Sequence, residues 1–317
     1  MRVKFGVQVP QEGFSYSEIK KVFSVLEELG YYSALVYDHF HPIWSAEDAE
    51  VLENWVLLSA LAVETERIRL GTLVNCNSYR NPSLLAKMAA SLDVISGGRL
   101  EFMIGAGWYK EEYMGYGYPF PPFKVRAAQL KEAIEVLKLM WTQHRAYFNG
   151  KYYKLEGALC YPKPVQKPYP RVWVGGGGEK YTLRVVAEVG DGTNFFGSPE
   201  VFERKLGVLR EHCEKVGRDF DEIAKSWAGD VVIGLTETEV ENRLKKLRAM
   251  LKRRGMSDDV PFEEIEAPRL IGTPEQIMDK LERYLKLGVN YFVVIFPDPL
   301  DVEALKIFAE KIIASFD

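Results

Sequence analysis

The chain has 317 residues, of which 47% are hydrophobic and 27% charged, so it can bury a large core. Its formal net charge of −4 argues against a nucleic-acid partner or a membrane surface, because both are normally bound through a basic excess. Three scattered cysteines show no metal-ligand spacing and no disulfide framework, and no apolar run approaches the roughly 18 residues of a membrane span. These features predict a cytoplasmic, enzyme-sized protein that acts on a small-molecule substrate.

Strands and helices alternate from the start of the chain. Residues 3–9 form a predicted strand, and the helix that follows ends at Gly30. The second strand, residues 33–37, ends in a charged loop at residues 38–42. A second helix is predicted around residues 53–64.

The most complete strand–helix–strand unit follows. Residues 68–74 are short, apolar and β-rich, as expected of a strand that is covered on both faces of a parallel sheet. Asn81 before Pro82 predicts the start of a helix, and Gly97-Gly98 can end it in the left-handed conformation. Residues 99–104 then form a strand that runs into a Gly-Ala-Gly turn. The apolar residues that recur at helical spacing within this helix are Leu84, Met88, Leu92 and Ile95.

The second half begins with an aromatic loop at residues 108–123 and a helix. Asn149-Gly150 lies between β-prone residues and predicts a hairpin. Residues 171–174 form a strand that ends in four consecutive glycines, Gly175–Gly178, before another helix. Residues 255–268 are predicted to form an inserted loop. The remaining predicted strands, which alternate with helices, are residues 191–196, 226–233 and 291–296.

Eight predicted strands in this alternation indicate an α/β protein, a (β/α)8 TIM barrel formed by one domain over residues 1–317, with inserted loops and a hairpin before strand 5. An open doubly wound sheet is the alternative. Neither glycine cluster matches the dinucleotide-binding fingerprint, since Lys110 and Lys180 stand where the third glycine should be.

In such a barrel, chemistry takes place at the carboxyl ends of the strands. Gly175–Gly178 lie there, and backbone amides near a helix N-terminus can bind a phosphate group. The alternative is that these glycines only allow the strand and the helix to pack closely.

Asp38 and His39 end another strand at the same mouth. His39 is either a proton carrier or a residue that positions a cofactor, and a purely structural role is the alternative. The aromatic residues between Trp108 and Phe120 can form the wall of a pocket for a planar ligand or fix their loop to the barrel. Cys76 is interpreted as a packed thiol.

Several stretches of the chain resemble the luciferase-like monooxygenase superfamily. They occur in the same order and span nearly the whole chain, so the resemblance implies a bacterial luciferase-like barrel that binds a flavin or a deazaflavin, in a family where homodimers are common. The stretches are residues 70–74, 79–82, 93–99, 105–108, 161–166, 175–178 and 271–274.

The resemblance also implies the positions of the cofactor-binding residues. Deazaflavin-using members carry a non-prolyl cis peptide bond after the third strand, which corresponds here to Leu73-Val74. The phosphate of the cofactor would then bind at Gly176–Gly178. The predicted cofactor-binding set is Asp38, Leu73, Val74, Asn75, Gly107, Gly175, Gly176, Gly177 and Gly178.

Two features favour coenzyme F420, an 8-hydroxy-5-deazaflavin, over FMN. The loop that contains Asp38 and His39, with Trp44 after it, is similar to that of F420-dependent members, including glucose-6-phosphate dehydrogenases. Many FMN-dependent members place an arginine where this chain has Trp108. The sugar-phosphate enzymes carry an acidic residue at that same position, which argues against glucose 6-phosphate as the substrate.

The predicted function is hydride transfer between coenzyme F420 and a small organic substrate, with His39 as the acid or base. Trp44, Trp108 and Tyr113 are predicted to contact the substrate, and no metal is expected. The alternatives are an FMN-dependent monooxygenase that uses reduced flavin and oxygen, and a flavin-binding protein without catalytic activity.

Overall fold

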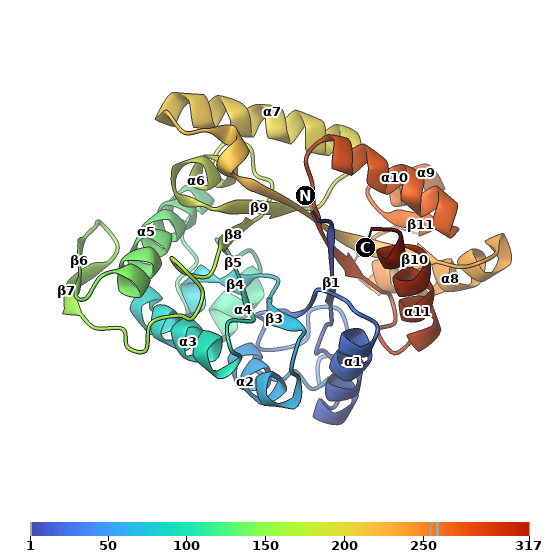
Figure 1. Cartoon of the computed structure of the whole chain (residues 1–317), viewed down its shortest axis with the longest axis horizontal. Helices are drawn as coiled ribbons and strands as arrows, with labels where there is room; N and C mark the ends of the chain where they lie inside the picture. The colour runs from blue at the N-terminus through green and yellow to red at the C-terminus, as the bar shows by residue number, and fades with distance from the viewer. Residues whose placement is uncertain (1, 254, 258–259, 317) are drawn as a thin grey trace.

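The computed structural model describes residues 2–253, 255–257 and 260–316. Within these residues, eight parallel strands close into a barrel and helices surround them (Figure 1), which confirms the predicted (β/α)8 fold. The barrel closes because the eighth strand pairs with both the seventh and the first. In spatial order the strands are β1 (Lys4–Gln8), β2 (Ser33–Val36), β3 (Arg69–Thr72), β5 (Leu100–Gly105), β8 (Val172–Gly175), β9 (Gly192–Phe195), β10 (Ala224–Ile233) and β12 (Tyr291–Ile295).

Helices connect most of these strands and pack against the outside of the barrel. The predicted hairpin before the fifth barrel strand is present as β6 (Ala146–Asn149) and β7 (Lys154–Ala158), and β11 (Leu270–Gly272) extends the sheet beside β10. The helices are α1 (Tyr16–Glu28), α2 (Asn54–Glu64), α3 (Pro82–Ile95), α4 (Lys110–Gly115), α5 (Phe123–Thr142), α6 (Thr182–Val189), α7 (Pro199–Val216), α8 (Glu237–Arg253), α9 (Phe262–Glu266), α10 (Pro274–Lys286) and α11 (Val302–Lys311).

The strands are buried on both faces, as their continuous apolar runs predict. Every residue of β2 and β5 is buried, because one face meets the helices and the other meets the barrel interior. The interior is filled by side chains from several strands, so it is a packed core rather than a channel. These interior residues are Leu35, Met103, Trp173, Ala228, Tyr291 and Val293.

Helix α3 begins and ends where the sequence predicts. The Asn81 side chain accepts a hydrogen bond from the Ser83 N–H, and Gly97 and Gly98 have positive φ values of 67° and 88°. The predicted apolar face is wrong in part, since Leu84 and Ile95 are each 54% exposed. The helix instead packs through a neighbouring face that contains Leu85 and three alanines, Ala86, Ala89 and Ala90, whose small side chains allow close approach to the barrel and α5.

Other boundaries differ from the sequence predictions. The predicted strand at residues 68–74 stops at Thr72, and the chain resumes pairing with β5 through β4 (Asn75–Cys76). The peptide bond between Leu73 and Val74 is cis, in agreement with the resemblance. The predicted aromatic loop contains α4, and the predicted inserted loop contains α9.

Some predictions extend beyond the described residues. Positions 258 and 259 of the predicted inserted loop lie outside them, as do positions 1, 254 and 317 of the predicted single domain. The division into one domain stays a prediction. Among residues 2–253, 255–257 and 260–316, no helix combines the length and apolar character needed to cross a membrane.

Candidate active site

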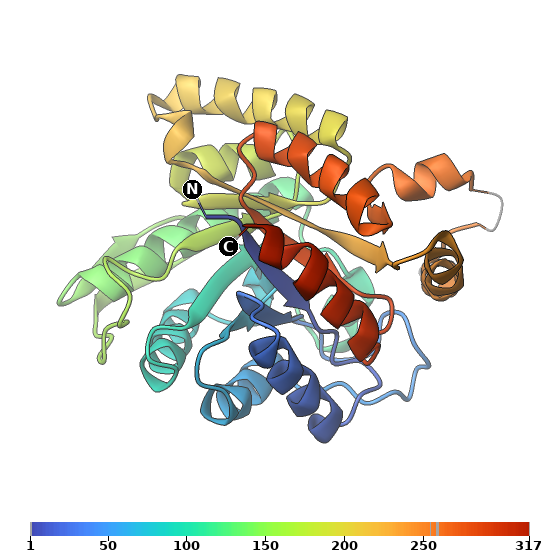
Figure 2. The ribbon, with the colours of Figure 1, turned by 45° about the vertical axis from the view of Figure 1, so that its right-hand side comes forward.

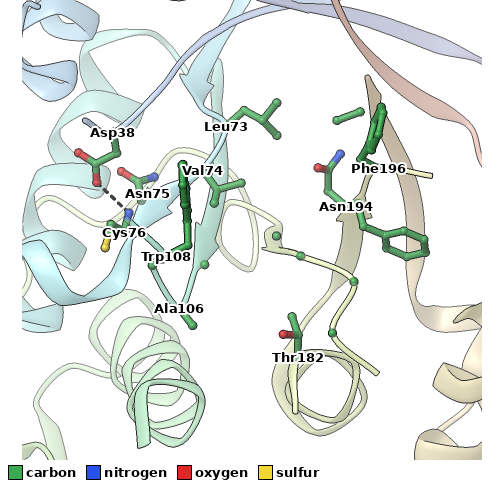
Figure 3. A pocket seen from close by; sticks show the side chains of 18 of the residues that line it. Asp38, Leu73, Val74, Asn75, Cys76, Ala106, Trp108, Thr182, Asn194 and Phe196 are labelled. Atoms are coloured by element: carbon green, nitrogen blue, oxygen red, sulfur yellow. Dashed lines mark hydrogen bonds between the residues drawn. The ribbon is translucent and has the colours of Figure 1, made fainter. Parts of the chain in front are cut away.

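A cavity of about 530 Å³ opens at the carboxyl ends of the barrel strands, within the size range of small-molecule sites. Figure 3 shows Val74 on one wall and Asn194 on the opposite wall, with the glycine-rich segment above Thr182. The structure brings most of the predicted site residues to this cavity. Those that line it are Asp38, His39, Leu73, Val74, Asn75, Gly107, Trp108 and Gly175–Gly178.

The glycine segment connects β8 to the residues before α6. Gly176 has a φ of 109°, which disfavours any side chain, and its N–H bonds to the Asn194 carbonyl at 2.8 Å. Within the described residues, no partner accepts a hydrogen bond from the N–H of Gly177 or Gly178. These two backbone donors are therefore available to a ligand at this wall of the cavity.

Lys205 of α7 places a positive charge behind the same segment. A Cβ atom on Gly177 would lie 2.5 Å from Lys205 Nζ, so only glycine leaves this space open without moving the ammonium group. Burial lowers the pKa of Lys205, whose Nζ lies 5.3 Å from the centre of the Phe195 ring. Two free amides, a cation and the nearby start of α6 fit a phosphate group. No sequence pattern predicts a role for Lys205 in this site, because the residue lies on α7, after the next strand, β9.

Val74 projects into the cavity between the ends of β5 and β8. Each of these strands has a glycine beside the valine side chain. A Cβ atom on Gly105 would lie 2.9 Å from Val74 Cγ2, and one on Gly175 would lie 2.7 Å from Val74 Cγ1. Glycine at both positions therefore makes room for the valine. Together with Leu73, Val74 presents an apolar surface that fits one face of a planar ring.

His39 is held by Glu112, a residue that no sequence motif indicates. The His39 Nδ1 and Glu112 Oε2 atoms are 2.9 Å apart, and the Phe40 N–H donates to Glu112 Oε1 at 2.6 Å. The Tyr79 hydroxyl donates to the same carboxylate. Burial raises the pKa of Glu112, but the hydrogen bonds from His39, Tyr79 and Phe40 outweigh it and the pKa is lowered overall.

The ionised Glu112 fixes the tautomer of His39. A carboxylate only accepts hydrogen bonds, so Nδ1 carries the proton and Nε2 of the neutral ring is an acceptor. The ring is further held edge-on by Tyr37 and Trp108, at centroid distances of 5.1 and 5.8 Å. His39 lines the cavity, and its contact with Glu112 uses Nδ1 rather than Nε2.

Asp38 supports the neighbouring backbone. Its carboxylate forms a two-oxygen ion pair with Arg80, at 2.8 and 3.0 Å from Nη1, and accepts the Cys76 N–H at 2.8 Å (Figure 3). Burial raises the pKa of Asp38, and the Arg80 charge opposes that shift. Since both oxygens already have partners, the predicted contact between Asp38 and a cofactor stays a prediction.

Two residues of the predicted substrate set lie behind the cavity wall. Trp44 does not line the cavity; its ring stacks on that of Trp108, with centroids 5.9 Å apart and planes at 18°. Tyr113 is fully buried, and its hydroxyl bonds to Cys76 Sγ at 3.1 Å and Ala106 O at 3.3 Å. The predicted direct contact between Tyr113 and substrate is therefore not compatible with this geometry. Tyr113 instead fills the space that a side chain on Gly107 would need.

Cys76 is buried, as its interpretation as a packed thiol predicts. Burial, and secondarily the nearby Asp38 carboxylate, raises its pKa to about 12. A thiol with this pKa is almost entirely protonated at neutral pH, which makes it a poor nucleophile.

Comparison with known proteins agrees with this architecture. An F420-dependent glucose-6-phosphate dehydrogenase of Gordonia bronchialis is 28% identical over 310 residues, covering 92% of this chain and 90% of its own. Two solved structures share the fold over the full length of both chains. An F420-dependent secondary alcohol dehydrogenase, in complex with an F420–acetone adduct, has a TM-score of 0.86 at 22% identity. The coenzyme F420 dependent tetrahydromethanopterin reductase of Methanopyrus kandleri has a TM-score of 0.83 at 24% identity.

The sequence model of one family spans nearly all of the barrel. It matches residues 2–291, a range that contains every strand end that lines the cavity. The chain therefore belongs to the luciferase-like monooxygenase family.

Proposed function

We propose that the protein is an oxidoreductase that transfers a hydride between coenzyme F420 and a small organic substrate. The observation that carries this proposal is His39, which lines the cavity and is held through Nδ1 by the buried Glu112. The relative from Gordonia bronchialis is named as F420-dependent and aligns over nine-tenths of both chains, which supports the choice of cofactor.

The residues of the cavity fit the parts of such a cofactor. The N–H groups of Gly177 and Gly178, with Lys205 behind them, would hold its phosphate, and Val74 would contact its ring. When bound, a deazaflavin supplies a carbon centre that accepts or donates a hydride and does not readily activate oxygen.

His39 would carry the proton in this reaction. As a substrate hydroxyl becomes a carbonyl, its proton passes to His39 Nε2, and the reverse reaction returns it. The ionised Glu112 stabilises the resulting imidazolium through its hydrogen bond to Nδ1. Trp108, which Trp44 stacks against, forms the aromatic wall on the substrate side.

The cavity favours an uncharged substrate. Among the residues that the structure describes, no lysine or arginine lines it, and Lys205 lies behind the glycine segment. A sugar phosphate would need a cation on the substrate side, because burying its charge without a partner is costly. We therefore propose a small alcohol or carbonyl compound rather than glucose 6-phosphate.

Cofactor titration tests this function directly. Purified protein is titrated with coenzyme F420 and separately with oxidised and reduced FMN, following cofactor fluorescence or absorbance. We expect tight binding of F420 and weak binding of both FMN forms. A preference for reduced FMN would favour the monooxygenase alternative, whereas F420 binding without turnover of any alcohol or carbonyl would favour a non-catalytic binding protein.

The glycine segment can be tested by substitution. Gly177→Val and Gly176→Val are each expected to weaken cofactor binding by about tenfold or more, the first by displacing Lys205 and the second through its φ of 109°. Gly207→Val on α7 is the matched control, because open space surrounds that glycine. Unchanged cofactor affinity in both test variants would remove the phosphate site from this segment.

The homodimer also stays a prediction, supported by exposed aliphatic side chains on two adjoining helices. Val56 and Val63 of α2 are 73% and 72% exposed, and Leu84 and Ile95 of α3 are each 54% exposed. The two helices lie side by side (Figure 2). Symmetric pairing would cover this apolar surface in both copies. Sedimentation velocity of the wild type and of Val63→Glu checks the prediction, which requires a dimer for the first and a shift to monomer for the second.

A further inference from the structure

A second cavity, of about 440 Å³, lies at the amino ends of the barrel strands, opposite the active site. Lys4 begins β1, Arg69 begins β3 and Arg171 directly precedes β8. Residues that line this cavity come from several strands and from the segment before β8, so the closed barrel assembles it. The charged residues at its surface are Lys4, Arg69, Glu101, Lys167, Arg171 and Asp191.

Both carboxylates of this cavity are already engaged. Glu101 forms an ion pair with Arg69 and accepts hydrogen bonds from the Tyr32 hydroxyl at 2.9 Å and Trp173 Nε1 at 3.3 Å. Asp191 pairs with Lys138, which is not part of the lining, at 2.6 Å. It also accepts the N–H of Val172 at 2.9 Å. Neither carboxylate therefore has to neutralise the remaining cations.

The remaining cations of the cavity are Lys4, Lys167 and Arg171. None of them has a carboxylate partner within the part of the chain that the structure describes. Lys4 Nζ donates to the Tyr32 hydroxyl at 3.0 Å, and Lys167 Nζ donates to the Pro164 carbonyl at 3.0 Å. The guanidinium of Arg171 lies 5.6 Å from the centre of the Trp173 ring. Among the described ion pairs, none includes these three residues.

The positive charges act on one another across the cavity. Burial lowers the pKa of Lys4; Glu101 opposes this shift, and Arg171 and Arg69 add to it. Such an arrangement is costly in the protein alone, because like charges are held together on a half-buried surface. An anion placed between Lys4 and Arg171 would relieve this cost and gain charge-assisted hydrogen bonds.

We propose that this cavity is a binding site for a small organic phosphate monoester. With Glu101 paired to Arg69 and Asp191 paired to Lys138, three cationic side chains of the lining remain, and they can balance the charge of about −1.5 to −2 that a phosphate monoester carries at neutral pH. Arg171 provides the planar donor pair that suits phosphate oxygens. The partly exposed rings of Tyr32 and Tyr169 provide apolar surface for the organic part. The site shares no residue with the cavity at the other end of the barrel.

Calorimetric titration of the full-length protein with phenyl phosphate at low salt tests the proposal. Arg171→Gln and Lys4→Gln are each expected to weaken binding by about tenfold, since each removes a charged hydrogen-bond donor. Arg210→Gln is the matched control, because Arg210 is also exposed and lies over an aromatic ring, Phe220, away from this cavity. Its affinity for phenyl phosphate should stay within twofold of the wild type, a margin of about 0.4 kcal/mol.

The cofactor phosphate site is the main competing location for the probe, and Gly177→Val separates the two. Phenyl phosphate affinity should survive in Gly177→Val and fall in Arg171→Gln, and this holds whether or not the protein uses coenzyme F420. The opposite pattern would overturn the proposal, as would the absence of binding by the wild type at millimolar phenyl phosphate. Inorganic phosphate should bind more weakly, because it cannot contact the rings, and tighter binding of inorganic phosphate would contradict the assignment to an organic ester.

Discussion

His39→Ala is expected to lower the rate of hydride transfer by about 10²- to 10⁴-fold, the usual contribution of a positioned acid or base. The affinity for coenzyme F420 should remain close to that of the wild type, because the glycine segment and Val74, rather than His39, fit the phosphate and the ring. Single-turnover absorbance measurements of the cofactor give the rate, and fluorescence titration gives the affinity.

A remote histidine controls for general effects of the substitution. His144 lies outside the cavity, with Nδ1 bonded to the Tyr161 hydroxyl at 2.7 Å, so His144→Ala should transfer hydride at the wild-type rate. Added imidazole should restore part of the activity of His39→Ala by occupying the vacated space. Wild-type turnover in His39→Ala would exclude His39 as the proton carrier, and an equal loss of cofactor affinity would instead assign it a binding role.

The sequence predicts the barrel because local signals and the overall fold agree. Asn81-Pro82 starts a helix, Gly97-Gly98 ends it, and the strands on either side are continuous apolar runs. The same agreement places His39, Val74 and Gly175–Gly178 at one end of the barrel, since each lies at the carboxyl end of a strand or within three residues of it. Residues whose position depends on a strand end are therefore predictable from the chain alone.

Other parts of the site depend on packing that no local pattern specifies. Glu112 lies 73 residues from His39 in sequence, on a helix of only six residues within an apparently irregular aromatic segment. Lys205 reaches the glycine segment from a helix that follows the next strand. Tyr113 was predicted at the substrate because it is aromatic, but its hydroxyl finds partners inside the wall. Such contacts become visible only when the elements are placed in space.

Glu112→Gln should show how far the activity depends on the orientation and tautomer of His39. An amide nitrogen beside Nδ1 donates instead of accepting, which favours the tautomer with the proton on Nε2 and removes the base on the cavity side. A change from carboxylate to amide behind a catalytic histidine can cost several orders of magnitude in kcat, so we expect a loss of about 10²-fold or more. KM should change much less, because Glu112 does not line the cavity. Nitrogen NMR of the His39 ring reports the tautomer directly.

The neighbouring residue provides the matched control. Glu111 is exposed and accepts a hydrogen bond from the Tyr109 hydroxyl at 3.0 Å, so Glu111→Gln makes the same chemical change one position away and should leave kcat near the wild-type value. If Glu112→Gln changes the tautomer of His39 but keeps the wild-type kcat, then the activity does not depend on that tautomer.

The pH dependence of the unfolding free energy measures, independently of kcat, how much the charge of Glu112 stabilises the fold. Because the pKa of Glu112 in the folded protein lies below its ordinary value of 4.5, the ionised group stabilises the fold above that pH. This stabilisation is lost as the pH falls through the lowered folded pKa. The difference in unfolding free energy between the wild type and Glu112→Gln should therefore be largest at neutral pH and shrink below about pH 4.5, as denaturant titrations at several pH values would show. A difference that stays constant across this range would mean that the charge of Glu112 contributes nothing to holding His39, and that only the shape of the side chain matters.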